Sequence, residues 1–171
     1  DGQLLQVSTD FVFNGHQGFP YGLEQKRDPL GVYGRTKAGG EEAVEQLLVA
    51  GGRGTILRTS WVYGPVGRNF LLTMLQLHRE RKQLKVVADQ VGCPTSTRSL
   101  AMACWALVDW DSQANLPSLL HWSDAGVASW YDFAVAIGEL ALSRGLVEHV
   151  AEVIPITSAE YPTPAQPPSY S

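Results

Sequence analysis

Proton chemistry in this sequence begins with Tyr33 and Lys37, which lie four positions apart at the start of a predicted helix. That spacing places both side chains on one helical face, one turn apart. A nearby ammonium group stabilises a phenolate and lowers the pKa of a phenol from its ordinary value of about 10. The pair could therefore donate a proton at neutral pH, although a plain surface pair has the same spacing.

A second polar group, Ser8-Thr9-Asp10, follows a predicted buried strand over residues 3–7. Ligands of open α/β sheets bind beyond the carboxyl ends of the strands, so a hydroxyl there could hydrogen-bond a carbonyl that Tyr33 protonates. Alone, Ser-Thr-Asp is typical of a turn or a helix cap. A strand followed by Ser-Thr-Asp, a long loop and Tyr-x-x-x-Lys on a helix indicates such a site far more specifically than Ser-Thr-Asp or Tyr-x-x-x-Lys alone.

The elements that must position these residues alternate between strands and helices, which predicts an α/β fold with a largely parallel sheet. We expect strands at residues 3–7 (extended by 11–13), 55–62, 84–87, 119–122 and 153–156. We expect helices at about 33–49, 69–81, 98–109 and 129–143, with Asn69 and Ser129 as N-caps. The helix at 98–109 is apolar on most sides and is therefore expected to be buried. In the last helix, Trp130, Phe133, Ile137 and Leu140 are expected to face inward.

Composition excludes several classes of protein. The 171 residues are 44% hydrophobic and 18% charged, which is not the composition of a disordered chain. The net charge of −4 offers no basic field for nucleic acid, and no apolar run approaches the roughly 20 residues of a membrane span. Two cysteines without a CxxC pair indicate the cytoplasm, and scattered histidines predict no metal site.

Six stretches carry a resemblance to a known family, in that family's order: VSTDFVFNG, PLGVYGRTKAGGE, ILRTSWVYGPVGRNF, VVADQVGCPTST, SWYDFA and YPTPAQPPSYS. They are similar to the extended short-chain dehydrogenase/reductases, and among these to the dTDP-4-dehydrorhamnose reductase family. The resemblance implies reduction of the C4 ketone of a dTDP-4-dehydro-6-deoxy-L-mannose to dTDP-L-rhamnose. NADPH or NADH would be the cofactor, a dTDP-sugar the substrate, and a homodimer an open alternative.

The resemblance also implies roles for particular residues. Tyr33 would be the general acid, and Lys37 would lower its pKa and hold the hydroxyls of the nicotinamide ribose. Thr9 would be the catalytic hydroxyl that polarises the carbonyl. The implied contacts with the sugar nucleotide come from Thr9, Asp10 and Trp61, with Asn69 and Gln90 as weaker candidates.

Three alternative functions of the same fold differ from the reductase in the residues that they require. A 4,6-dehydratase would carry Glu where this chain has Phe11, which argues against that activity. A 4-epimerase usually has Asn where this chain has Trp61, so Trp61 favours the reductase. A non-catalytic regulatory subunit of the same fold would have no need of intact Thr9, Tyr33 and Lys37.

A glycine-rich phosphate loop is missing, because neither GxGxxG nor GxxGxxG occurs. We therefore expect a partial Rossmann-type sheet that lacks its first βαβ units, interleaved with a small substrate-binding domain. Residues 1–64 would be the end of a dinucleotide-binding domain and 65–171 mainly substrate-binding, with about 98–122 returning to the sheet. Such a fragment is expected to be inactive alone. In the tail, Gln166-Pro167 stands where the family usually has Arg before Pro.

Overall fold

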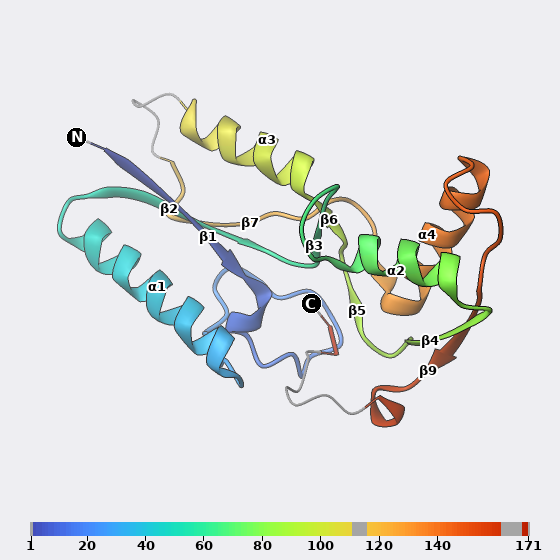
Figure 1. Cartoon of the computed structure of the whole chain (residues 1–171). Helices are drawn as coiled ribbons and strands as arrows, with labels where there is room; N and C mark the ends of the chain where they lie inside the picture. Colours follow the sequence, from blue (N-terminus) through green and yellow to red (C-terminus); the bar gives the residue numbers. More distant parts are fainter. Residues whose placement is uncertain (1, 111–115, 162–168, 171) are drawn as a thin grey trace.

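A three-stranded parallel sheet, in the order β1-β2-β7, forms one part of the fold (Figure 1). The structure is a computed structural model that describes residues 2–110, 116–161 and 169–170. The strands of this sheet are β1 (Gln3–Thr9), β2 (Arg53–Thr59) and β7 (Leu119–His121). Helix α1 (Val32–Val49) lies on one side of the sheet and α3 (Thr97–Val108) on the other. The central strand β2 is covered on both faces, and its residues from Thr55 to Thr59 are all buried.

Helix α1 is held on the sheet by one stripe of buried residues. Gly34, Ala38, Glu41 and Val44 recur at helical spacing and are the buried positions of this helix. The helix ends before Gly51, whose positive φ of 84° suits the turn into β2. The stripe fixes which face of α1 looks at β1, and with it the direction of the Tyr33–Lys37 face.

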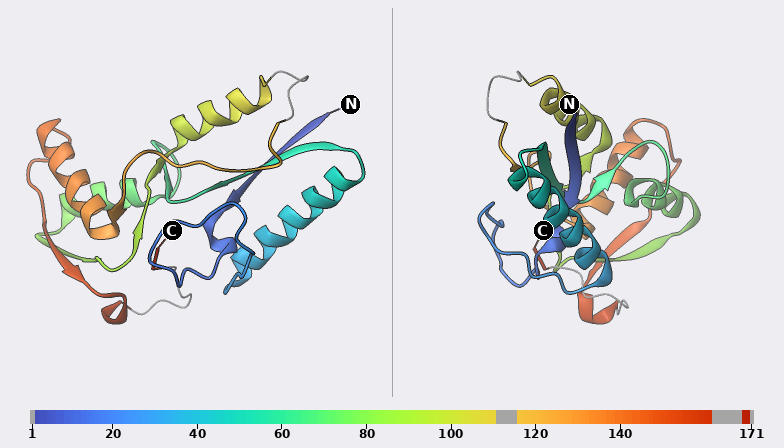
Figure 2. Two further views of the ribbon diagram at one scale, coloured as in Figure 1. Left: turned by 180° about the vertical axis from the view of Figure 1, so that it is seen from behind. Right: turned by 90° about the vertical axis from the view of Figure 1, so that its left-hand side faces the viewer.

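The other part of the fold packs α2 (Phe70–Glu80) and α4 (Trp130–Ser143) against the parallel pair β4 (Gln83–Val87) and β9 (Glu152–Ile156). Its core consists of the buried side chains Met74, Leu84, Val86, Ala134, Ile137 and Ala151. The two expected N-caps are confirmed: Asn69 accepts from the Leu72 amide, and Ser129 forms a capping box with Asp132. This part lies beside the three-stranded sheet (Figure 2).

Short elements complete the fold. They are η1 (Asp10–Val12), β3 (Val62–Tyr63), β5 (Val91–Gly92), β6 (Thr95–Ser96), β8 (Ala128–Ser129) and η2 (Ser158–Glu160). Strand β3 pairs with β6 in parallel, and β5 pairs with β8 in antiparallel orientation. Near the end of the chain, the Ser169 amide donates to the Gly15 carbonyl and Tyr170 forms a bridge with Val91. The predicted α/β class with a parallel sheet is therefore confirmed.

Two strand predictions are wrong in detail. Residues 11–13 do not extend β1, because Thr9 caps a 3-10 turn by accepting from the Phe11 amide. Such local side-chain bonds compete with strand pairing. The strand expected at 55–62 is broken after Thr59, because Trp61 adopts a left-handed φ of 48°.

Two burial predictions are also wrong. Helix α3 is not buried all round, because Met102 and Trp105 are 64% and 67% exposed on the face turned away from the sheet. In α4, Leu140 is 56% exposed, whereas Ile137 is buried as expected. An apolar sequence shows which side chains avoid water but does not show whether a neighbour covers them.

Candidate functional site

The carboxyl end of β1 presents Thr9, which is almost fully buried. Its hydroxyl donates a 2.9 Å hydrogen bond to Asp10 Oδ1 and accepts a 3.3 Å bond from the Phe11 amide. The hydroxyl is thus oriented by two partners at the strand end. For a ligand carbonyl to accept a hydrogen bond from Thr9, the Thr9 hydroxyl would have to turn away from Asp10 Oδ1, to which it now donates.

The first two turns of α1 bring Tyr33 and Lys37 to the same strand end. The Tyr33 ring meets the Phe11 ring edge to face, with centroids 5.7 Å apart, and remains 54% exposed. The Lys37 ammonium donates a 3.2 Å bond to the carbonyl of Val7 on β1. Thr9 lies between these two contact points in sequence, so the structure gathers all three predicted catalytic residues around the end of β1.

Gly34 lets α1 come this close. A Cβ at this position would lie 2.2 Å from the Phe11 carbonyl oxygen and 2.9 Å from Pro29 Cβ. No side chain larger than hydrogen fits there without movement of the backbone. The glycine between Tyr33 and Lys37 therefore sets the approach of the helix to the turn after β1.

Below this end of the sheet lies a buried ionic cluster. The Glu41 carboxylate on α1 is fully buried and accepts from Ser8 Oγ at 2.5 Å, from Arg58 Nε at 2.9 Å and from Arg58 Nη2 at 2.6 Å. Arg27 adds a 3.1 Å bond and also forks onto Glu45. Burial alone would raise the pKa of the Glu41 carboxyl, but the bonds from Arg58 and Ser8 outweigh it and hold the pKa below its ordinary value. This cluster was not predicted from the sequence.

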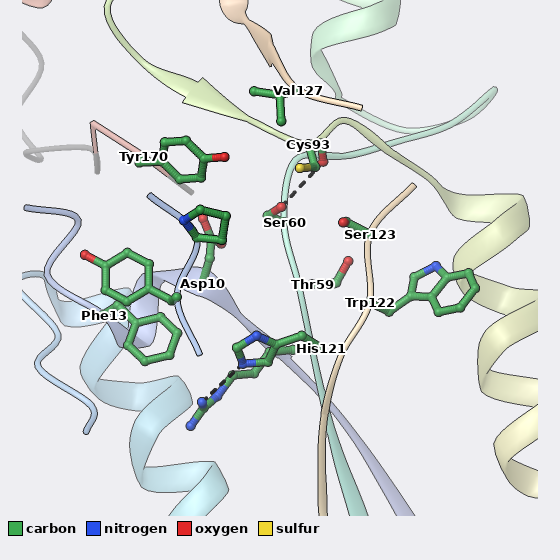
Figure 3. A pocket seen from close by; sticks show the side chains of 13 residues that line it. Asp10, Phe13, Thr59, Ser60, Cys93, His121, Trp122, Ser123, Val127 and Tyr170 are labelled. Carbon is green, nitrogen blue, oxygen red and sulfur yellow. Dashed lines mark hydrogen bonds between the residues drawn. The ribbon is translucent and has the colours of Figure 1, made fainter. Parts of the chain in front are cut away.

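A cavity of about 360 Å³ opens at the carboxyl ends of all three strands (Figure 3). Its lining residues are Asp10, Phe13, Pro20, Tyr21, Arg58, Thr59, Ser60, Cys93, His121, Trp122, Ser123, Val127 and Tyr170. Among the predicted site residues, Asp10 belongs to this lining. The position agrees with the rule that ligands of parallel sheets bind beyond the strand ends.

Two lining residues have notable polar groups. The Thr59 hydroxyl is buried and has no hydrogen-bond partner among the described residues. The His121 ring lies 3.4 Å from Arg58 Nη1, and desolvation of the ring together with the Arg58 charge lowers the pKa of His121. A ligand with a donor or acceptor at the right place could satisfy Thr59.

Trp61 lies at the junction between the two parts of the fold. Its indole stacks on Trp130 with centroids 3.5 Å apart and planes 3° from parallel. Gly92 packs so closely on Trp61 that a Cβ there would lie 2.5 Å from the indole. Because Trp130 covers one face, a ligand could reach Trp61 only at its remaining surface.

Asn69 and Gln90 already use their amides within the protein. Asn69 caps α2 and donates to the carbonyls of Gly64 and Val66. Gln90 accepts from the Trp130 indole at 3.1 Å and donates to the Ser158 hydroxyl at 2.8 Å. Contact of either residue with a substrate stays a prediction. Gln166-Pro167, where the sequence departs from the Arg-Pro usual in the family, lies outside the described residues.

The residues that the structure describes bring no three His, Cys, Asp or Glu side chains into reach of one metal ion. Within the same residues, no helix combines the length and the apolar character needed to cross a bilayer.

Several known proteins are similar to this chain over nearly its whole length. The family model described as "RmlD substrate binding domain" matches residues 1–171. Spore coat polysaccharide biosynthesis protein SpsK of Bacillus subtilis is 40% identical over 169 residues, covering 99% of this chain and 55% of that protein. dTDP-4-dehydrorhamnose reductase of Sinorhizobium fredii is 40% identical over 171 residues, covering 98% and 56%. The chain therefore spans about half the length of these curated relatives.

Solved structures show the same relation. The structure of dTDP-4-dehydrorhamnose reductase from Bacillus anthracis in complex with NADP aligns with a TM-score of 0.85 at 34% identity, covering 98% of this chain and 55% of that one. UDP-glucose 4-epimerase from Brucella ovis aligns with a TM-score of 0.70 at 18% identity, covering 97% and 55%. The second likeness concerns the fold alone.

Proposed function

Because the chain belongs to the RmlD substrate binding domain family, we propose that it forms the catalytic and substrate-binding part of an NAD(P)H-dependent sugar-nucleotide reductase. The reaction is reduction of the C4 ketone of dTDP-4-dehydro-6-deoxy-L-mannose to dTDP-L-rhamnose. The observation that carries the proposal is the gathering of Thr9, Tyr33 and Lys37 around the carboxyl end of β1. Relatives that span the chain at about 40% identity include a dTDP-4-dehydrorhamnose reductase, which supports the same substrate.

In this reaction Tyr33 gives its phenolic proton to the C4 oxygen, because it is the exposed acid beside the strand end. The Thr9 hydroxyl turns from Asp10 to the same oxygen and stabilises the negative charge that develops there. Lys37 stands one helical turn from Tyr33, so its ammonium favours transfer of the phenolic proton.

The residues present fit the nicotinamide end of the cofactor. Lys37 and the half-exposed Tyr33 offer donors for ribose hydroxyls, and the buried Thr59 hydroxyl is an unpartnered polar atom among the described residues. When bound, the cofactor supplies the hydride that adds to C4. The sequence contains no glycine-rich loop for the pyrophosphate end, so this chain provides only part of a cofactor site.

The remaining assignments are part of the same proposal. Asp10 and Trp61 contact the sugar nucleotide. Asn69 and Gln90 make weaker contacts with it. Residues 1–64 together with about 98–122 form the end of the dinucleotide-binding domain, and the rest of 65–171 binds substrate. A cytoplasmic location, a homodimer and the lack of a nucleic-acid partner complete the proposal.

To test the proposal, the chain is fused to the amino-terminal half of the Sinorhizobium fredii reductase. Oxidation of NADPH is then measured with the 4-dehydro sugar as the substrate. We expect turnover to dTDP-L-rhamnose, identified by NMR, and no turnover by the 171-residue chain alone. Tyr33→Phe should lower kcat by about 10²- to 10⁴-fold, the usual contribution of a general acid. Tyr161→Phe, at an exposed tyrosine of η2's carboxyl end, is the matched control and should leave kcat unchanged.

Three results would contradict the proposal. A completed protein that melts cooperatively but does not oxidise NADPH would exclude the reductase and favour the regulatory-subunit reading. In a parallel assay with dTDP-L-rhamnose as the substrate, inversion of its C4 hydroxyl without a net change in NADPH would assign an epimerase. Equal activity of Tyr33→Phe and the unchanged protein would remove Tyr33 from the mechanism.

A further inference from the structure

We propose that Glu41 is a positioning residue that sets the place of Tyr33 and Lys37 at the end of β1. Tyr33, Lys37 and Glu41 follow one another at intervals of four along α1, so all three lie near one face of the helix. Glu41 is the buried member of this series. The proposal rests on the proposed function only for what Tyr33 and Lys37 do.

The contacts of Glu41 join the three elements that carry the site. Ser8 precedes Thr9 on β1, and Arg58 precedes Thr59 on β2. Glu41 binds both at once, with Ser8 Oγ on one carboxylate oxygen and the Arg58 fork across both oxygens. Since each partner adjoins a residue of the strand ends, the register of α1 against β1 and β2 is fixed next to the site.

The two hydrogen bonds from Arg58 to Glu41 fix the orientation of α1 relative to β2 as well as the distance between them. A bidentate guanidinium–carboxylate pair fixes a plane as well as a distance, unlike an apolar contact. Helix α1 is thus held at two points along its axis, by Gly34 against the Phe11 carbonyl and by Glu41 against Ser8 and Arg58. Lys37 lies between these points, and Tyr33 lies directly beside the first.

A purely structural role is the competing explanation, because a lone buried charge destabilises any fold. The two explanations differ for the double substitution Glu41→Met with Arg58→Met. Replacing both charges by apolar groups of similar length restores stability in many buried pairs. It does not restore a planar fork, so a positioning role predicts recovered stability without a recovered site.

The test follows the contact between the Tyr33 and Phe11 rings by the NOE in the 171-residue chain, with Tyr33→Phe identifying the signals. The NOE falls as the inverse sixth power of distance. From the 5.7 Å centroid separation, a displacement of about 1 Å, enough to lower an enzymatic rate by up to about 10²-fold, weakens the NOE roughly 2.6-fold. Glu41→Gln should show at least this loss. Glu45→Gln, which removes the exposed partner of Arg27 from the same helix, should not.

The double variant should be more stable than Glu41→Gln, with the NOE still weakened. An unchanged NOE in folded Glu41→Gln, or an NOE that recovers together with stability in the double variant, would overturn the proposal. Failure of both variants to fold would assign Glu41 to the fold alone and would also overturn it. Since no substrate or cofactor is present, these outcomes do not depend on the reductase assay.

Discussion

Substituting Gly34 by alanine should destabilise the protein, although glycine is normally a poor helix residue. An added Cβ would lie 2.2 Å from the Phe11 carbonyl oxygen, and real Cβ atoms essentially never approach a heavy atom below 3.0 Å. The start of α1 must therefore move by roughly 0.8 Å, the difference between these two distances. The obstacle is backbone and not the end of a flexible side chain, so it cannot turn aside.

Gly39→Ala is the matched control. Gly39 belongs to the same helix, is exposed, and has no heavy atom within 4 Å of an added Cβ. Alanine there should stabilise the protein by about 0.5–1 kcal/mol through helix propensity. Gly34→Ala gains a similar amount but also suffers overpacking of about 1–3 kcal/mol. The propensity gain cancels between the two variants, so the difference in unfolding free energy should equal the overpacking.

Urea unfolding followed by circular dichroism at 222 nm measures both free energies on the isolated chain. The sign of the change is decisive: Gly34→Ala should unfold at lower urea than Gly39→Ala, with an equal slope. If the two variants were equally stabilised, α1 would not be in contact with the Phe11 carbonyl. The close approach described for the site would then be refuted.

Two further changes test other features. Gly92→Ala places a Cβ 2.5 Å from the Trp61 indole and should disturb the stack on Trp130, shifting tryptophan fluorescence and costing about 1–3 kcal/mol. Unchanged fluorescence together with unchanged stability would show that Gly92 does not pack against the indole. The folded-state pKa of Glu41 lies below its ordinary value, so its ionised form stabilises the protein above the unfolded pKa of about 4.3. That stability is lost as pH falls through the folded pKa. Urea unfolding should show a flatter pH dependence below about pH 4.3 for Glu41→Gln, and an equal slope would contradict the reading.

Local signals accounted for much of the fold. The Asn69 and Ser129 caps were predictable because each depends on residues within three positions of itself. The face shared by Tyr33 and Lys37 follows from helical spacing alone. Trp61 shows the limit, because a strand pattern does not indicate a left-handed φ that ends the strand.

The long-range contacts of the site were not predicted from the sequence. Glu41 binds Arg58 across 17 positions and Ser8 across 33, and no local pattern specifies such a pair. A signal did exist: Arg58 stands inside the apolar strand TILRTS, and a charge there needs a buried partner. The cavity was missed for a similar reason, since loop residues such as Tyr21 and Tyr170 complete it from distant parts of the chain.

The buried pair of Glu41 and Arg58 restricts how this protein can evolve. Substitution of Glu41 leaves the Arg58 charge unpaired inside the fold, at a cost of about 3–5 kcal/mol, which is much of the stability of an ordinary domain. Substitution of Arg58 removes two hydrogen bonds from the buried Glu41 carboxylate and leaves it the bond from Arg27. Exchange of both residues for apolar ones can be neutral. The two positions are therefore separated from any alternative pair by an intermediate of low fitness. Descendants of this sequence should keep both residues or change both, and a drift that alters only one should be rare.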